Sequence, residues 1–126
     1  MIQQEIVLKA TVEKVYQTLT NSELFSEMTG APASIGTTQG DQFSCFGGMI
    51  LGRNIELLEN KMLVQAWRVK LWELGHYSSV RFVLEAKGAE TKLTLTHSGF
   101  CEEHKELLSQ GWHDNYWTPM QHYFKH

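Results

Sequence analysis

One histidine, at position 97, has a sequence environment that could support acid–base chemistry. Leu93, Leu95 and His97 stand at alternate positions, so a strand would place all three side chains on one face. A neutral imidazole on that face could orient a bound carbonyl group or act as a general base. The alternative is a core histidine whose ring nitrogens are hydrogen-bonded. Because no carboxylate or nucleophile accompanies His97 at a clear spacing, we predict no catalytic residue and no enzymatic activity.

A second candidate group lies between residues 67 and 77. It consists of Trp67, Arg68, Trp72 and Tyr77. The three aromatic rings could form the wall of a ligand cavity, with the guanidinium group stacking on a ring or pairing with an anion. In the alternative, the rings belong to the core and Arg68 faces solvent. Trp67 and Trp72 have opposite parity, so a regular strand would place them on opposite faces unless a bulge re-aims one of them.

The remaining histidines and the two cysteines give no metal-binding pattern. His122 and His126 stand four residues apart and could bracket a metal ion on a helix, but no third ligand accompanies them. Cys45 and Cys101 stand alone rather than in a metal or redox spacing, which indicates reduced thiols. His76 fits a turn and receives no chemical role. We therefore predict no metal site and no cofactor.

The composition places the chain among ordinary globular proteins. Apolar residues make up 42% and charged residues 20% of the 126 residues, so we expect a single domain over residues 1–126. The net charge of −3 and the absence of a Lys/Arg cluster argue against nucleic acid as a partner. No apolar run is long enough to span a membrane. Residues 1–9 lack the pattern of a signal peptide, so the expected location is the cytoplasm.

The last stretch, Glu102 to Phe124, reads as one long helix with an aromatic face. At a hundred degrees per residue, a half-turn-wide stripe collects Leu108, Trp112, Tyr116, Met120, Tyr123 and Phe124. Such a face requires a broad cover, for which a curved sheet is suitable. Pro119 removes one helical hydrogen bond and crowds the carbonyl of Asn115. We therefore expect a kink or an early stop near Trp117.

The rest of the chain supplies that sheet. Ile2 to Lys9 alternates as a half-buried strand, and Thr11 and Asn21 or Ser22 begin two short helices, the second ending at Thr29-Gly30. Strand and turn signals then alternate as far as residue 98, with the clearest strands at Phe43–Phe46, Met49–Leu58, Met62–Trp72, Tyr77–Ala86 and Thr91–Ser98. Short connections between strands favour an antiparallel meander, and hence the α+β class.

Several motifs also carry a family resemblance. These are Gly30-Ala31-Pro32-Ala33, Gly40 with Phe43, Gly48, Gly52, Val64 with Trp67-Arg68, Trp72, Gly75-His76-Tyr77-Ser78, Thr91, Leu93, Leu95, Gly99 and Gly111-Trp112. In this order they resemble the helix-grip (START-like) superfamily. Within it, the chain is similar to the C-terminal domain of the activators of the ATPase of the ninety-kilodalton heat-shock chaperone, and to their single-domain bacterial relatives.

The resemblance implies a curved antiparallel sheet of six to seven strands around the long C-terminal helix, with a cavity between them. It implies a non-catalytic, stress-related interaction domain whose partner is a heat-shock chaperone. The alternative is a carrier or sensor of a small hydrophobic molecule held in the cavity. An enzyme of the cyclase or hydrolase kind, with His97 as its base, is a third alternative. The predicted cavity residues are Trp67, Arg68, Trp72, Tyr77, Phe82, Leu95, His97, Leu108, Trp112, Tyr116 and Met120.

Overall fold

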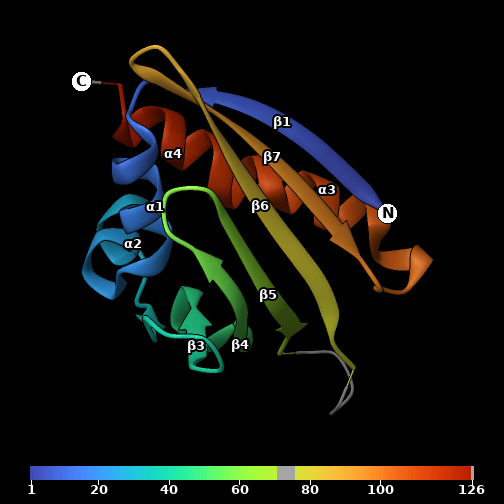
Figure 1. Cartoon of the computed structure of the whole chain (residues 1–126). Helices are drawn as coiled ribbons and strands as arrows, with labels where there is room; N and C mark the ends of the chain where they lie inside the picture. Colours follow the sequence, from blue (N-terminus) through green and yellow to red (C-terminus); the bar gives the residue numbers. More distant parts are fainter. Residues whose placement is uncertain (71–75, 126) are drawn as a thin grey trace.

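The structure is a computed structural model that describes residues 1–70 and 76–125. Within these residues, seven strands form one antiparallel sheet in the order β1-β7-β6-β5-β4-β3-β2 (Figure 1). The strands are β1 (Ile2–Leu8), β2 (Ser34–Ile35), β3 (Gln42–Cys45), β4 (Ile50–Leu58), β5 (Met62–Val69), β6 (Ser78–Lys87) and β7 (Glu90–Ser98). The predicted α+β meander is confirmed. The first strand pairs with the last, which brings Ile2 opposite His97.

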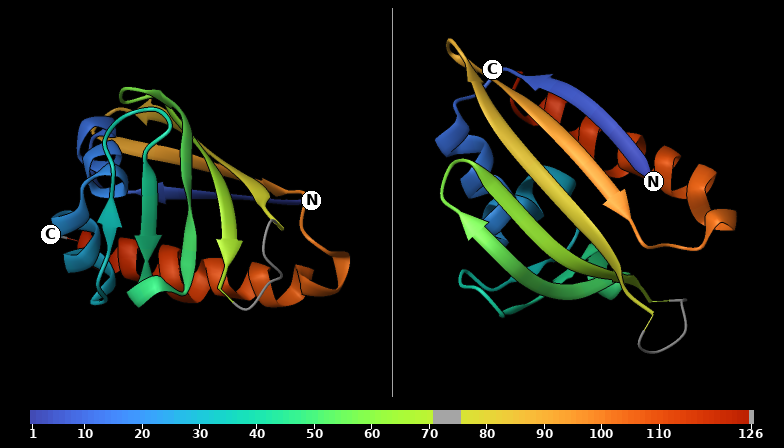
Figure 2. Two further views of the ribbon diagram at one scale, coloured as in Figure 1. Left: turned by 90° about the horizontal axis from the view of Figure 1, so that it is seen from below. Right: turned by 45° about the vertical axis from the view of Figure 1, so that its right-hand side comes forward.

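Two short helices, α1 (Val12–Thr20) and α2 (Ser22–Thr29), follow β1 as predicted. Each begins at a polar cap: the side chain of Thr11 accepts a hydrogen bond from the Lys14 N–H at 3.3 Å, and that of Asn21 accepts from the Leu24 N–H at 2.9 Å. The second helix ends at Gly30, whose φ of 76° is left-handed and suits glycine. The pair lies at one end of the sheet (Figure 2).

The C-terminal helix lies along one face of the sheet (Figure 2). It is built from four segments. These are η2 (Glu102–His104), α3 (Lys105–Trp112), η3 (His113–Trp117), which is a π-helical turn, and α4 (Thr118–Tyr123). Of the predicted kink or early stop near Trp117, the early stop is wrong, because the helix continues to Tyr123. It widens instead: the Thr118 N–H donates to the His113 carbonyl, five residues back.

The π turn explains how the helix accommodates Pro119. Proline lacks an N–H, and in an α-helix its ring would crowd the carbonyl four residues earlier. The widened turn ends at Trp117, two residues before Pro119, which lies in the first turn of α4. Because a π turn holds one residue more than an α turn, it also rotates the following side chains. Trp117, which regular spacing places opposite Leu108, is consequently only 3% exposed.

The sheet buries one face against this helix. In β6, Val80, Phe82 and Leu84 are buried while the residues between them are exposed, and in β7 Leu93, Leu95 and His97 are buried. These are the faces that the alternation predicts.

Within the described residues, no helix is long and apolar enough to cross a lipid bilayer.

One glycine in β4 marks a close approach of neighbouring strands. Gly52 pairs with Phe43 on one side and Trp67 on the other. A Cβ there would overlap the carbonyl oxygen of Ala66 and lie 2.7 Å from the Phe43 ring. The sheet therefore has no room for a larger residue at this position.

We expect Gly52→Ala to lower the free energy of unfolding by ~1–3 kcal/mol, because the extra methyl group forces the strands apart. Urea unfolding measures this value. Gly111→Ala is the matched control, because its new Cβ would lie 3.7 Å from the nearest atom, Nδ2 of Asn115. Alanine is preferred to glycine in a helix by about 1 kcal/mol. Equal stabilities of the two variants would contradict the close approach at Gly52.

Candidate functional site

A cavity of about 340 Å³ lies between the C-terminal helix and the β4–β5 end of the sheet. The sheet side and the loop before β4 contribute Phe46, Met49, Ile50, Trp67 and Val69. The helix contributes Leu107, Leu108, Gly111, Trp112, Asn115 and Tyr116. The lining is apolar apart from the Asn115 amide, the Tyr116 hydroxyl and the indole N–H groups. Among the described lining residues, no carboxylate, imidazole, amine or thiol faces the cavity.

Four of the residues predicted from the sequence line this cavity: Trp67, Leu108, Trp112 and Tyr116. Four others are buried inside the core instead, each at most 1% exposed: Phe82, Leu95, His97 and Met120. They lie on the predicted faces, but other side chains separate them from the open space.

The group between residues 67 and 77 is not brought together as an aromatic wall. Arg68 follows Trp67 in β5 and therefore lies on the opposite face, where its Nη1 donates to the Lys70 carbonyl at 3.1 Å. The Tyr77 side chain is 49% exposed. Trp72 lies outside the described residues.

Sequence reasoning missed several lining residues that helical and strand spacing could have indicated. Val69 shares its strand face with Trp67, two residues away. Gly111 and Asn115 stand next to Trp112 and Tyr116 on the helix and occupy the edge of the same face. The signal was weak because glycine and asparagine do not add to an apolar stripe.

His97 is held in a buried hydrogen-bond chain. The indole Nε1 of Trp112 donates to His97 Nδ1 at 3.1 Å, and His97 Nε2 lies 2.8 Å from the Ser78 hydroxyl. That hydroxyl donates in turn to the Trp67 carbonyl at 3.2 Å. Every link has a donor and an acceptor only if the imidazole is neutral with its proton on Nε2. His97 is therefore a hydrogen-bonded core residue in this structure.

The electrostatics agree with this tautomer. Burial, with a smaller contribution from the positive N-terminus, lowers the pKa of His97 to about 4. The ring is fully buried, and both nitrogens are occupied. His97 thus has neither the access nor the free nitrogen that a general base needs.

The other buried titratable groups near the helix are also chemically quiet. Burial raises the pKa of the Cys45 thiol to about 12, so it stays protonated and is a weak nucleophile at neutral pH. Burial also raises the pKa of Tyr116 well above its ordinary value. Of the two C-terminal histidines, His122 is exposed and His126 lies outside the described residues.

Trp67 combines a stacked ring with an unmet donor. Its ring stacks on Trp112 with centroids 4.9 Å apart and planes 19° apart. Trp67 is only 4% exposed, yet its Nε1 has no hydrogen-bond partner among the described residues. Leaving a buried donor unpaired costs about 1–3 kcal/mol. The Nε1 atom is fully enclosed, so this unpaired donor belongs to the packed core and not to the cavity surface.

The chain is similar to proteins of one family along nearly its whole length. Residues 9–125 match the family model described as Activator of Hsp90 ATPase homolog 1-like protein. The human protein named activator of 90 kDa heat shock protein ATPase homolog 1 is 30% identical over 124 residues. The aligned region covers 95% of this chain but only 37% of the human protein. This chain thus corresponds to well under half of that relative.

Two further relatives carry the same family description in their names. Mouse activator of 90 kDa heat shock protein ATPase homolog 2 is 32% identical over 95 residues, which is 74% of this chain and 29% of that protein. The crystal structure of an HSP90 activator from Plasmodium falciparum superposes with a TM-score of 0.83 at 26% identity. The superposition covers 94% of this chain and 92% of that one. These relatives confirm the predicted helix-grip fold.

The His97 chain predicts a pH-dependent stability. The folded-state pKa of about 4 lies below the ordinary value of 6.5, so the unfolded state binds the extra proton between these values. The stabilising contribution is complete above pH 6.5 and is lost as the pH falls to 4. The shift corresponds to about 3 kcal/mol. Urea unfolding of wild type and His97→Gln at both ends of this range measures it.

Glutamine at position 97 keeps an acceptor for Trp112 and a donor for Ser78 but does not titrate. We therefore expect the wild-type free energy of unfolding to fall with acid by about 2–3 kcal/mol more than that of the variant. Parallel pH dependences would mean that His97 has the same pKa in the folded and unfolded states.

Proposed function

The chain belongs to the Activator of Hsp90 ATPase homolog 1-like family, and on that basis we propose that it is a non-catalytic binding module for an Hsp90-class chaperone. The observation that carries the proposal is the match over residues 9–125, together with 30% identity to the human activator. The chemistry of the site supports it, because the cavity lining described here has no general acid, general base or nucleophile. Recognition of another protein then depends on surface shape and apolar contact.

An apolar rim at the cavity is the best-suited contact surface. We define this rim as Met49, Ile50, Val69, Leu107 and Leu108, all of which line the cavity. Leu107 is 78% exposed and Met49 is 43% exposed, which leaves methyl and methylene groups in water. Covering such groups in an interface recovers roughly 25 cal/mol per Å² of apolar surface. Large exposed apolar side chains grouped at a hollow are typical of protein-binding sites.

The first test is an association and ATPase assay with the Hsp90-class chaperone of the source organism. We expect the wild-type chain to bind the chaperone and change its ATPase rate. Leu107→Glu should weaken binding about tenfold or more, because it places a charge on the apolar rim. Its stability should stay within ~0.5 kcal/mol of wild type, since residue 107 is a surface position.

Leu58→Glu is the matched control, because Leu58 is 47% exposed and lies at the opposite end of β4. We expect it to bind the chaperone as wild type does. No association and no rate change with wild type would refute the chaperone proposal. Equal losses in both variants would refute the assignment of the rim.

A second candidate function is the carriage of a small hydrophobic molecule, which the cavity itself favours. A volume of about 340 Å³ falls at the lower end of the ~300–1,000 Å³ typical of ligand pockets. The lining is almost entirely apolar, which suits an apolar molecule. Native mass spectrometry of protein purified from its own host would detect a retained ligand.

Gly111 allows a direct test of the cavity, because it lines the space and no atom lies closer than 3.7 Å to a Cβ built there. Gly111→Phe should fill the cavity and reduce binding of an anilinonaphthalene dye at least tenfold. Gly111→Ala removes the same helical glycine without filling the space, so it should retain dye binding. Dye fluorescence titration measures both. Equal affinities for the dye would show that this cavity is not where it binds.

A further inference from the structure

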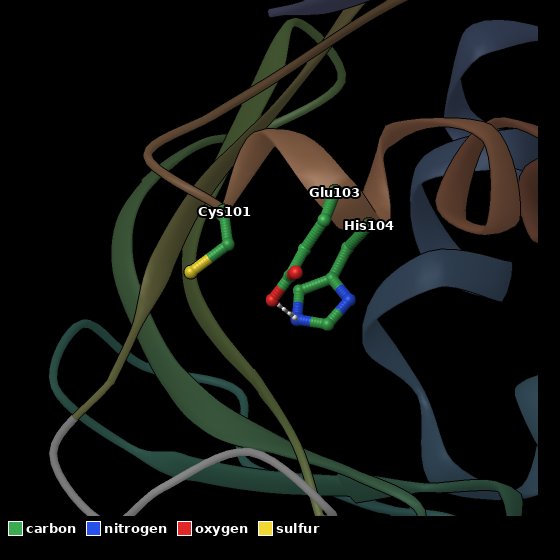
Figure 3. A group of neighbouring side chains, drawn as sticks. All are labelled: Cys101, Glu103 and His104. Atoms are coloured by element: carbon green, nitrogen blue, oxygen red, sulfur yellow. Dashed lines mark ion pairs between the residues drawn. The ribbon is translucent and has the colours of Figure 1, made fainter.

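Three possible metal ligands lie together where the C-terminal helix begins (Figure 3). Cys101 directly precedes η2, and Glu103 and His104 lie within that turn. Their side chains extend to the same side of the turn, and their ligand atoms all lie within 4.8 Å of one another. The backbone closes the turn through a 2.9 Å hydrogen bond from the His104 N–H to the Cys101 carbonyl.

A fourth possible ligand comes from another part of the chain. His76, two residues before β6, places its Nε2 3.6 Å from Cys101 Sγ. A tetrahedral zinc ion with Zn–S ≈ 2.3 Å and Zn–N ≈ 2.0–2.1 Å holds its sulfur and nitrogen ligands about 3.5 Å apart. The observed separation matches that value. It brings together two residues that the sequence alone left without a chemical role.

We propose that His76, Cys101, Glu103 and His104 bind one divalent transition-metal ion of the Zn²⁺ type. One thiolate, two imidazoles and one carboxylate form a four-ligand set, as tetrahedral zinc requires. The thiolate and imidazoles select against Mg²⁺ and Ca²⁺, which prefer oxygen ligands. None of the four residues lines the cavity, so this site is separate from the proposed binding surface.

The cluster can contract around an ion by side-chain rotation. Glu103 Oε1 lies 3.9 Å from His104 Nε2, and their side chains are 80% and 34% exposed. Exposed side chains change rotamer on the ps–ns timescale, so Glu103 and His104 can move toward an ion without a change of fold. His76 contacts Cys101 but lies outside the group of three whose ligand atoms are within 4.8 Å of one another, so Glu103 and His104 must move toward the Cys101–His76 pair to complete the set.

A metal ion held in this way would cross-link the segment before β6 to the start of the C-terminal helix. Gly99 already packs closely there, since a Cβ built at this glycine would lie 3.6 Å from the Cα of Ser78. Because the ion binds the folded chain, it would stabilise that chain by mass action.

Cobalt titration of the full-length, reduced protein tests the proposal. Co²⁺ bound tetrahedrally to a thiolate gives a sulfur-to-cobalt charge-transfer band and intense visible absorption. We expect one equivalent of Co²⁺ to produce both, and Zn²⁺ to displace it and raise the Tm. Cys101→Ser should abolish the charge-transfer band. His76→Ala, His104→Ala and Glu103→Gln should each weaken Co²⁺ binding at least tenfold.

Glu102→Gln is the matched control, because Glu102 belongs to the same turn but pairs with Lys105 at 3.9 Å. Its Co²⁺ affinity should stay within twofold of wild type. A wild-type protein without the charge-transfer band would overturn the proposal, as would a band that survives Cys101→Ser and so arises from Cys45. An affinity unchanged by His76→Ala would overturn the four-ligand site. None of these outcomes bears on chaperone binding.

Discussion

The arrangement of this protein depends on a stack of three tryptophans that joins the sheet to the C-terminal helix. Trp67 of β5 stacks on Trp112 of α3, and Trp112 stacks on Trp117 of the π turn at 5.5 Å. Aromatic pairs of this kind contribute about 0.5–1.5 kcal/mol each beyond the apolar area that they bury. Hydrogen bonds from Trp112 to His97, and from Trp117 to Gln4 at 2.6 Å, then determine the rotation of these two rings. The position of the helix on the sheet follows from this stack.

The cavity is a consequence of the same packing. Trp67, Trp112 and Tyr116 are large, and the helix residues beside them, Gly111 and Asn115, are too small to fill the space that the rings leave. A molecule in the cavity would therefore touch the rings that hold the helix in place. A partner that covers the rim would close over the same cavity. Binding and helix position are thus physically coupled, and none of this requires a reactive group.

The start and the middle of the C-terminal helix differ in chemistry. Its middle presents apolar groups to the cavity, whereas its first turn carries carboxylates, an imidazole and a thiol next to His76. The charged and soft groups thus lie outside the core. This separation lets the helix serve as a rigid support for an apolar contact surface while its start holds a possible cation.

Much of the fold was determined by the sequence through interactions within a few residues. Strand alternation, the Thr11 and Asn21 caps and the glycine at position 30 each act locally, and they appear in the structure where the pattern predicts them. The aromatic face of the last helix was also readable, because helical spacing is a local property. What only the tertiary structure decided depends on residues far apart in the chain. Trp117 is buried because a π turn lets it reach Gln4, 113 residues away, and His76 meets Cys101 across 25 residues. Spacing along the chain carries no information about such pairs, since the sheet register and the widened turn together set their distances.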